Sequence, residues 1–416
     1  MIPYLVCFFI STFFLGIAEV FRKGNPHYDV NTIFIQKKKK KNNGYFAFAN
    51  TIFKTENKIL WLLFSALGIF VICYFSGVRD LTIGTDTSIY PYKAYIYASN
   101  SASFKIFYTQ ASNEIVSEPL YILMVYFTTK RFGTFSSVLF VTTLLTVLPV
   151  YISLNQINQT YRKNYVWFAM LIFYLMYFPF SFNLGRQFIA IGISTLSYKY
   201  ILKKNPFKFT IVIIIAMLFH TSAIVATPLY FLYWVTEYQG DNGQKIINRH
   251  FRALVKKYRL TLRIALIVVC AISILFVMKA IVFFAGLTGR YTYQLDKLGN
   301  RSSMVWRNSI FVLAFLLIWL PAIEQIQKYR KIYYYVFIYL ISAVLFFSGW
   351  ITREAYRIAY FYSIALVFVI NEHIIVFHRI SNRLLYMSLY FIIAFAYFSY
   401  FFVFLNWGHI VPYMSK

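Results

Sequence analysis

The stretch Ser181–Ser222 decides the fold: it begins SFNLGRQFIAIGISTLSYKY at residue 181 and ends FTIVIIIAMLFHTS at residues 209–222. Arg186 and Gln187 lie where two apolar segments join, and His220 lies deep within a third. A charged group at membrane depth costs about 3 kcal/mol or more, so such residues usually face a protein interior or an aqueous cavity. The pattern predicts membrane helices that enclose a polar site.

Each of these polar residues also has a purely structural interpretation. Arg186 could be a helix-end residue whose long side chain reaches the lipid headgroups. His220 could be a packing residue that is hydrogen-bonded inside the bundle. Because both residues lie on neighbouring segments, we favour a functional site that contains them.

The composition is that of a polytopic membrane protein. Of the 416 residues, 60% are hydrophobic and only 13% are charged, with a mean hydropathy of +0.61. Soluble domains carry about 25% charged residues. The aromatic content of 22% suits lipid contact and interfacial belts. We therefore expect an all-α fold, a single polytopic membrane bundle over residues 1–416 with about 10–12 transmembrane segments.

The basic residues that give the net charge of +28 lie in short connections between apolar runs. Their placement is explained by contact with anionic lipid headgroups and by the orientation of the spans in the membrane, so we expect no nucleic acid partner. Cys7, Cys73 and Cys270 each lie in an apolar segment without paired spacing, which argues against disulfides and zinc. The sequence contains no P-loop, dinucleotide turn, HExxH or serine-hydrolase elbow. We expect neither a cofactor nor a metal.

The distribution of basic residues predicts the topology. The connection 22–58, with Lys37–Lys41 in a row, and the connection 237–263 are basic and should be cytoplasmic, which places both termini outside. The connection 79–118 is mixed in charge and should be an external loop, with residues 89–108 along the interface. The expected apolar segments are 2–21, 59–78, 119–130, 134–153, 165–182, 187–202, 209–236, 264–287, 308–323, 332–350, 358–377 and 384–405.

The central segments allow two arrangements. If all of them cross fully, Arg186 lies in the cytoplasm, and Lys199, Lys203, Lys204 and Lys208 lie outside, against the charge rule. In the alternative, 119–130 is a short re-entrant or interfacial piece, because it cannot span ~30 Å as a helix. The run 209–236 then breaks near His220 and lines a cavity. We favour the second arrangement, which places Arg186 outside.

The polar residues fall into clusters on this outer face. Gly84 permits a tight turn that could aim Asp86 inward. Arginines with few acids suit bidentate recognition of phosphate, and carboxylates and tyrosines suit sugar hydroxyls. Ion pairs within loops could equally explain Arg79-Asp80 and Arg353-Glu354. The four clusters are Arg79–Tyr90, Glu118-Pro119, Asn183 to Gln187 with His220, and Arg353 to Arg357. Arg353 and Arg357 are four residues apart and so share a helix face. Arg290-Tyr291 also falls on the outer side.

The order of these motifs resembles the EpsG family of bacterial membrane proteins, over roughly residues 60–370. The motifs are R-x4-G-T-D-T-x2-Y from Arg79, E-P-L from Glu118, N-x2-R-Q-x-I-A from Asn183, F-H-x-S from Phe219 and R-x3-R from Arg353. The resemblance implies a GT-C-like, Wzy-type glycosyltransferase. Such an enzyme would join undecaprenyl- or other polyprenyl-diphosphate-linked repeats into exopolysaccharide, capsule or O-antigen at the outer face of the bacterial cytoplasmic membrane. A flippase and a chain-length regulator would be its partners.

This reaction implies roles for the candidate residues. Arg186 would stabilise the diphosphate leaving group, followed in preference by Arg353 and Arg357. Either His220 or Asp86 could act as the base. The candidate catalytic residues are Arg186, His220 and Asp86, and the candidate substrate-binding residues are Arg79, Glu118, Asn183, Gln187, Arg290, Tyr291, Arg353 and Arg357.

Two other classes of protein could use similar residues. A lipid-linked glycan flippase also needs a cationic cavity, but the sequence shows no convincing internal repeat of the Gly84-Thr85-Asp86 or Arg186-Gln187 stretches. A membrane acyltransferase would need an activated nucleophile, which is not evident. We therefore favour the polymerase.

Overall fold

The computed structural model describes residues 1–22, 45–157, 165–237, 304–319, 330–348, 353–376 and 380–415. These residues contain helices and no β-strand, which confirms the all-α prediction. They form two compact units, Met1–Ile224 with Val367–Lys416, and Val225–Leu366. The predicted span 264–287 and the candidates Arg290 and Tyr291 lie outside the described residues.

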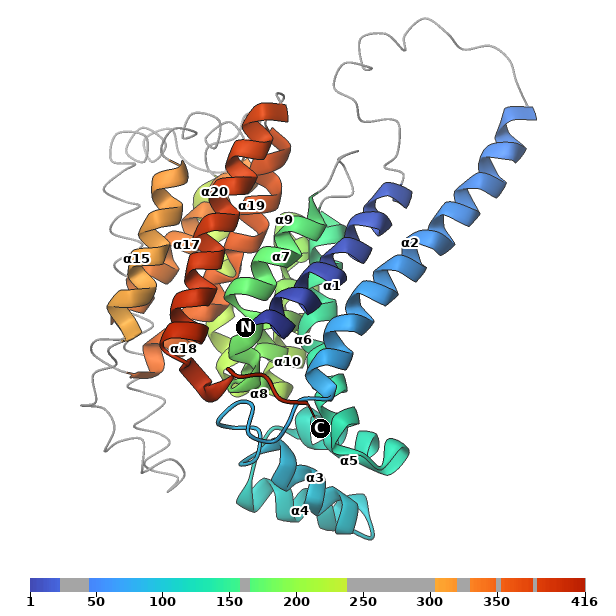
Figure 1. Ribbon diagram of the computed structural model, residues 1–416, viewed down its shortest axis with the longest axis vertical. Coiled ribbons are helices and arrows are strands. Elements are labelled where there is room, and N and C mark those ends of the chain that lie inside the picture. The colour runs from blue at the N-terminus through green and yellow to red at the C-terminus, as the bar shows by residue number, and fades with distance from the viewer. Residues whose placement is uncertain are drawn as a thin grey trace, which may run out of the picture. The chain divides into compact units, whose positions relative to one another are not determined.

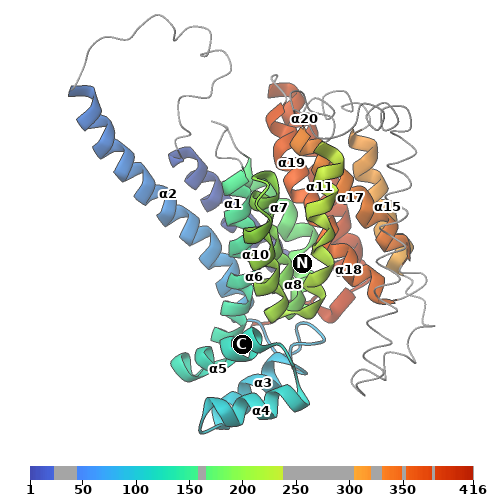
Figure 2. The ribbon, with the colours of Figure 1, turned by 180° about the vertical axis from the view of Figure 1, so that it is seen from behind.

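The first unit consists of helices packed side by side, with a group of shorter helices, α3 to α5, at one end (Figures 1 and 2). Its helices are α1 (Ile2–Phe21), α2 (Tyr45–Gly77), α3 (Pro91–Asn100), α4 (Phe104–Glu114), α5 (Pro119–Phe132), α6 (Phe135–Ile157), α7 (Val166–Met176), α8 (Gly185–Thr195), α9 (Tyr198–Leu202), α10 (Pro206–Phe219), α19 (Ala365–Val376) and α20 (Ile380–Phe398).

Five helices among the described residues are long and apolar enough to cross a membrane. They are Ile2–Phe21, Lys58–Gly77, Phe135–Ile157, Tyr356–Ile375 and Ile380–Phe404, and they coincide with predicted segments. Shorter apolar helices accompany them, including α7 and α10. The chain is therefore a helical membrane protein, and the total of 10–12 spans stays a prediction.

The run 209–236 is broken at His220, as the second of the two predicted arrangements requires. Helix α10 ends at Phe219, and the backbone of His220 is extended, with φ −160° and ψ 121°. A 3₁₀ segment, Thr221–Ala226, follows before α11 (Pro228–Glu237). Proline suits the start of α11 because the first helical N–H groups have no partner within the helix. The run 165–182 is also divided, into α7 and the 3₁₀ helix Phe178–Phe182.

Helix α7 lies in the core of the first unit, and nearly all of its side chains are buried. Its first backbone N–H groups need partners from elsewhere, because a helix cannot satisfy them itself. Glu19 of α1 accepts a hydrogen bond from the N–H of Trp167 at 2.8 Å. Asn371 of α19 accepts one from the N–H of Tyr165 at 3.1 Å. Two helices distant in sequence thus fix the position of α7.

Helices α6 and α8 approach each other closely at Gly192. A Cβ atom added to Gly192 would lie 2.5 Å from the carbonyl oxygen of Thr146. Nearby, the hydroxyl of Ser153 donates to the carbonyl of Thr195 at 2.6 Å. Small residues at membrane helix interfaces allow such close backbone contact. This contact sets the depth at which α8, and therefore Arg186, is held.

Both termini of the first unit lie at the same end as the segment 79–118. The Tyr4 hydroxyl donates to the carbonyl of Ile410 at 2.8 Å. The N–H of Asp80 donates to the carbonyl of Met414 at 3.0 Å. The predicted topology places these three parts outside the membrane on the same side, and this placement stays a prediction.

The second unit contains α11, α15 (Met304–Trp319), α17 (Arg330–Ser348) and α18 (Arg353–Ser363). Buried tyrosine hydroxyls connect α17 and α18 to the chain around α11: Tyr334 donates to the carbonyl of Leu229 at 2.8 Å, and Tyr362 donates to that of Val225, just before α11, at 2.6 Å. A tyrosine buried in this way needs a partner for its hydroxyl. Helix α18 carries Arg353 and Arg357 one turn apart, as predicted.

Replacement of Gly192 by alanine should destabilise the protein. The added methyl group would strike the Thr146 carbonyl, and overpacking of this kind costs about 2 kcal/mol. We expect a lower midpoint of thermal unfolding in detergent. Gly16→Ala is the matched control, because its Cβ would meet only the Trp167 side chain, at 3.7 Å from Cγ and 3.9 Å from Cβ, and alanine favours helix. Equal midpoints for both variants would contradict close packing at Gly192.

Candidate functional site

The candidate site lies at the end of the first unit where the loop 79–90 meets the ends of three helices. Helix α10 packs against both α5 and α8. Glu118 precedes α5, Arg186 is in the first turn of α8, and His220 ends α10. The site is therefore built from helix ends, where backbone groups and side chains are both available for binding.

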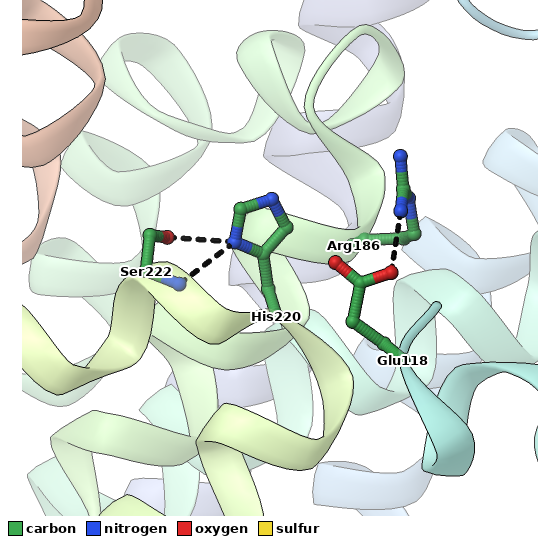
Figure 3. Close-up of polar contacts among 4 residues, drawn as sticks. All are labelled: Glu118, Arg186, His220 and Ser222. Atoms are coloured by element: carbon green, nitrogen blue, oxygen red, sulfur yellow. Dashed lines mark hydrogen bonds and ion pairs between the residues drawn. The ribbon is translucent and has the colours of Figure 1, made fainter. Parts of the chain in front are cut away.

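Arg186 and Glu118 form an ion pair, with Nη1 of Arg186 2.6 Å from Oε2 of Glu118 (Figure 3). The side chain of Glu118 is 4% exposed and that of Arg186 is 23% exposed. The Cζ atom of Arg186 also lies 5.3 Å from the ring centroid of Tyr90 and 5.8 Å from that of Tyr121. The guanidinium group is thus held between a carboxylate and two aromatic rings, with part of it accessible.

The position of Arg186 in its helix is unfavourable by local rules. The amino-terminal end of a helix carries partial positive charge, which disfavours a cation in the first turn. Glu118 at the start of α5 is favourably placed by the same rule. Local conflicts of this kind are expected at functional sites. The ion pair compensates for the conflict, so Arg186 is not there to stabilise α8.

Tyr121 is a site residue that the sequence did not reveal. It lies on α5 one turn after Glu118, and it is buried. Burial raises the pKa of Tyr121 to about 12, with smaller and opposing effects of Arg186 and Glu118. Its hydroxyl therefore stays protonated at neutral pH. The only available signal was its helical spacing from Glu118.

His220 is held through one ring nitrogen by Ser222. Nδ1 of His220 lies 2.7 Å from Oγ of Ser222 and 3.2 Å from its backbone nitrogen. A backbone N–H can only donate, so Nδ1 is an acceptor and the neutral ring carries its proton on Nε2. Figure 3 shows the ring of His220 with Ser222 on one side and Glu118 and Arg186 on the other. In this tautomer the hydrogen-bond donor of the His220 ring is Nε2.

The loop 79–90 contains the tight turn predicted at Gly84, where φ is +87°. A Cβ atom there would lie 2.8 Å from the carbonyl oxygen of Phe182. Thr85 donates to Oδ1 of Asn183 from its backbone nitrogen, at 2.6 Å, and from its hydroxyl, at 2.8 Å. The carbonyl of Asp86 accepts from the N–H of Tyr90 at 3.1 Å. The turn therefore places Asp86 one helical turn before the ring that contacts Arg186.

Arg79 lies behind this loop and is only 4% exposed. Its guanidinium group lies 4.1 Å from the ring centroid of Phe182 and donates to the hydroxyl of Ser76. Burial lowers the pKa of Arg79 to about 10, so it remains a cation at neutral pH. Asp80 instead accepts from the N–H and hydroxyl of Thr82, at 2.9 and 2.8 Å. Both residues support the loop from within.

The remaining candidates are distributed between the two units. Asn183 and Gln187, which are close to Arg186 in sequence, are buried and lie in the first unit. Arg357 is half-buried on α18 of the second unit, and the side chain of Arg353 lies outside the described residues. Across the described ranges, no group of three or more His, Cys, Asp or Glu side chains could hold a metal ion.

Comparison with known proteins identifies a family for this chain. A family model described as the EpsG family matches residues 59–415. No curated protein and no solved structure matches the chain. The match includes the loop 79–90, Glu118, Arg186 and His220.

Proposed function

The chain belongs to the EpsG family, and on that premise we propose that it polymerises polyprenyl-diphosphate-linked oligosaccharide repeats. The product would be exopolysaccharide, capsule or O-antigen, made at the outer face of a bacterial cytoplasmic membrane with both termini outside. The observation that best supports this proposal is the partly accessible Arg186 between Glu118, Tyr90 and Tyr121. A flippase and a chain-length regulator would work beside the protein.

Arg186 would bind the diphosphate of the growing chain. Its planar guanidinium can donate to two phosphate oxygens at once, which a lysine cannot do. Glu118 holds the guanidinium before substrate arrives, so the cation is not left unpaired in the protein interior. The diphosphate, which carries more negative charge, would then replace Glu118 as its main partner. Arg353 and Arg357 are further candidates for contacts to the leaving group.

The transfer itself exchanges one carbon–oxygen bond for another. A hydroxyl oxygen of the incoming repeat attacks the anomeric carbon of the growing chain, and the bond from that carbon to the diphosphate breaks. Polyprenyl diphosphate leaves, stabilised by Arg186. The hydroxyl proton passes to a carboxylate, for which Asp86 is our first choice and Glu118 the second.

His220 would act as a hydrogen-bond donor in this reaction. Because Ser222 occupies its Nδ1, its Nε2–H is suited to a phosphate oxygen or a sugar oxygen. This assignment favours Asp86 over His220 as the base. Gln187 and Asn183 would position the substrate or the loop that faces it.

A deletion strain tests the proposed function. We expect cells that lack the protein to make single repeats on their carrier or acceptor and no long chains. The measurement is the length of surface glycan on a gel together with the mass of lipid-linked intermediates. Loss of even the single repeat from the cell surface would indicate a flippase instead. Full-length polymer lacking only an acyl group would indicate an acyltransferase.

Arg186→Lys separates phosphate binding from charge alone. Lysine can keep an ion pair with Glu118, but it lacks the planar guanidinium group that donates to two oxygens at once. A contact that strengthens in the transition state is worth ~3 kcal/mol, so polymer yield should fall about a hundredfold at normal membrane abundance. The polymer yield of Arg186→Ala should be lower still. Near-normal polymer from the lysine variant would remove Arg186 from the reaction and support a helix-end role.

His220→Gln tests the role of the imidazole. Glutamine can place an N–H near the position of Nε2 but cannot accept a proton at neutral pH. If His220 donates a hydrogen bond, His220→Gln should keep polymer yield within about tenfold of wild type, and His220→Ala should lose about a hundredfold. Equal loss in both variants, at equal abundance, would assign His220 as the base.

A further inference from the structure

The residues 406–415, here called the C-terminal strap, run along the loop that carries Asp86. Figure 1 shows the strap crossing beside this loop after the end of α20. Arg79 and Ser415 form an antiparallel bridge. The N–H of Asp80 donates to the carbonyl of Met414 at 3.0 Å, and that of Gly84 donates to the carbonyl of His409 at 3.4 Å. The loop is therefore bonded to the strap at its start and at the tight turn.

The strap has its own anchors on two spanning helices. The Tyr4 hydroxyl of α1 donates to the carbonyl of Ile410 at 2.8 Å. The ring of Tyr413 stacks on that of Phe75 of α2, with centroids 4.2 Å apart and planes inclined by 13°. The Tyr413 hydroxyl also donates to the carbonyl of Phe75. Because these contacts do not involve the loop, the strap can serve as a fixed reference for it.

Gly408 of the strap touches the side chain that holds the loop. It has a φ of +75°, and a Cβ atom there would lie 1.9 Å from Nδ2 of Asn183. On its other side, Asn183 accepts from the N–H and hydroxyl of Thr85. Asn183 is 5% exposed, and its Nδ2 has no hydrogen-bond partner among the described residues. The amide is thus wedged between Gly408 and Thr85, and only its acceptor is used.

We propose that the C-terminal strap sets the position of Thr85 and Asp86 for the reaction, and that Gly408 and Asn183 are positioning residues. The role of Asp86 in the reaction rests on the proposed function. The contact between strap and loop does not. A side chain at Gly408 must push Asn183 away from the strap, and Thr85 must follow because it donates twice to the same oxygen. Asp86, the next residue, is then displaced from the position in which it would accept the proton.

The test compares Gly408→Ala with Gly133→Ala. Both glycines have positive φ, but a Cβ atom at Gly133 meets nothing within 4 Å. Polymer yield is measured together with the rate at which a thiol reagent labels Ser88→Cys, an exposed position on the loop, after subtraction of the chain without this cysteine. We expect Gly408→Ala to lose about a hundredfold of polymer, as misplacement by about 1 Å can cause, and to label severalfold faster. Gly133→Ala should match wild type in both.

A double-mutant cycle assigns the effect to Asn183. Asn183→Ala removes the side chain that the new methyl group would strike, so Gly408→Ala should add no further increase in labelling in that background. Membrane abundance is measured for every variant, so that a failure to fold is recognised. Fully additive effects would attribute the change to backbone strain at Gly408 and would contradict the proposal that the new side chain acts by displacing Asn183.

The other outcomes are also decisive. Unchanged labelling in Gly408→Ala would overturn the contact between strap and loop. Faster labelling with wild-type polymer would show that the reaction does not need the strap, and would overturn the positioning role. If a deletion strain makes full-length polymer, the proposed function fails, while the labelling comparison still decides whether the strap holds the loop.

Discussion

A helix that ends inside a membrane must find partners within the protein for its terminal N–H and carbonyl groups. The first unit depends on how this constraint is met. At one end of α7, Glu19 and Asn371 supply the missing acceptors. At the other end, the chain turns through a 3₁₀ helix into α8, and α10 ends at His220. The candidate site occupies this second set of helix ends, where the chain is irregular but enclosed by protein.

The same constraint explains why Arg186 is paired before any substrate arrives. A cation in a partly buried position is costly unless a carboxylate compensates it. Glu118 provides that compensation and stands at a helix end that favours its charge. The pair can then exchange one anion for another without leaving a bare charge inside the protein. Under the proposed function, the site would bind phosphate by replacing Glu118 as the partner of Arg186.

The sequence predicted those features that depend on neighbouring residues. Apolar runs predicted the spans at 2–21 and 59–78, the distribution of lysines around the central segments favoured the arrangement with a break at His220, and Gly84 predicted the tight turn. Features that depend on distant residues could not be predicted. The pairing of Arg186 with Glu118, the use of Tyr121 and the capping of α7 by Glu19 all join segments far apart in the chain. Hydrophobic periodicity carries no information about such pairs.

The hydrogen bond between Tyr4 and Ile410 joins residues separated by 406 positions. A membrane protein is inserted as it is synthesised, amino-terminal segments first, so this bond can form only after residue 410 has left the ribosome. The loop that bears Asp86 would remain without its final support until then. Assembly of the candidate site thus depends on synthesis as far as residue 410, and a chain cut short before that residue would lack the contacts that hold the loop 79–90 in place.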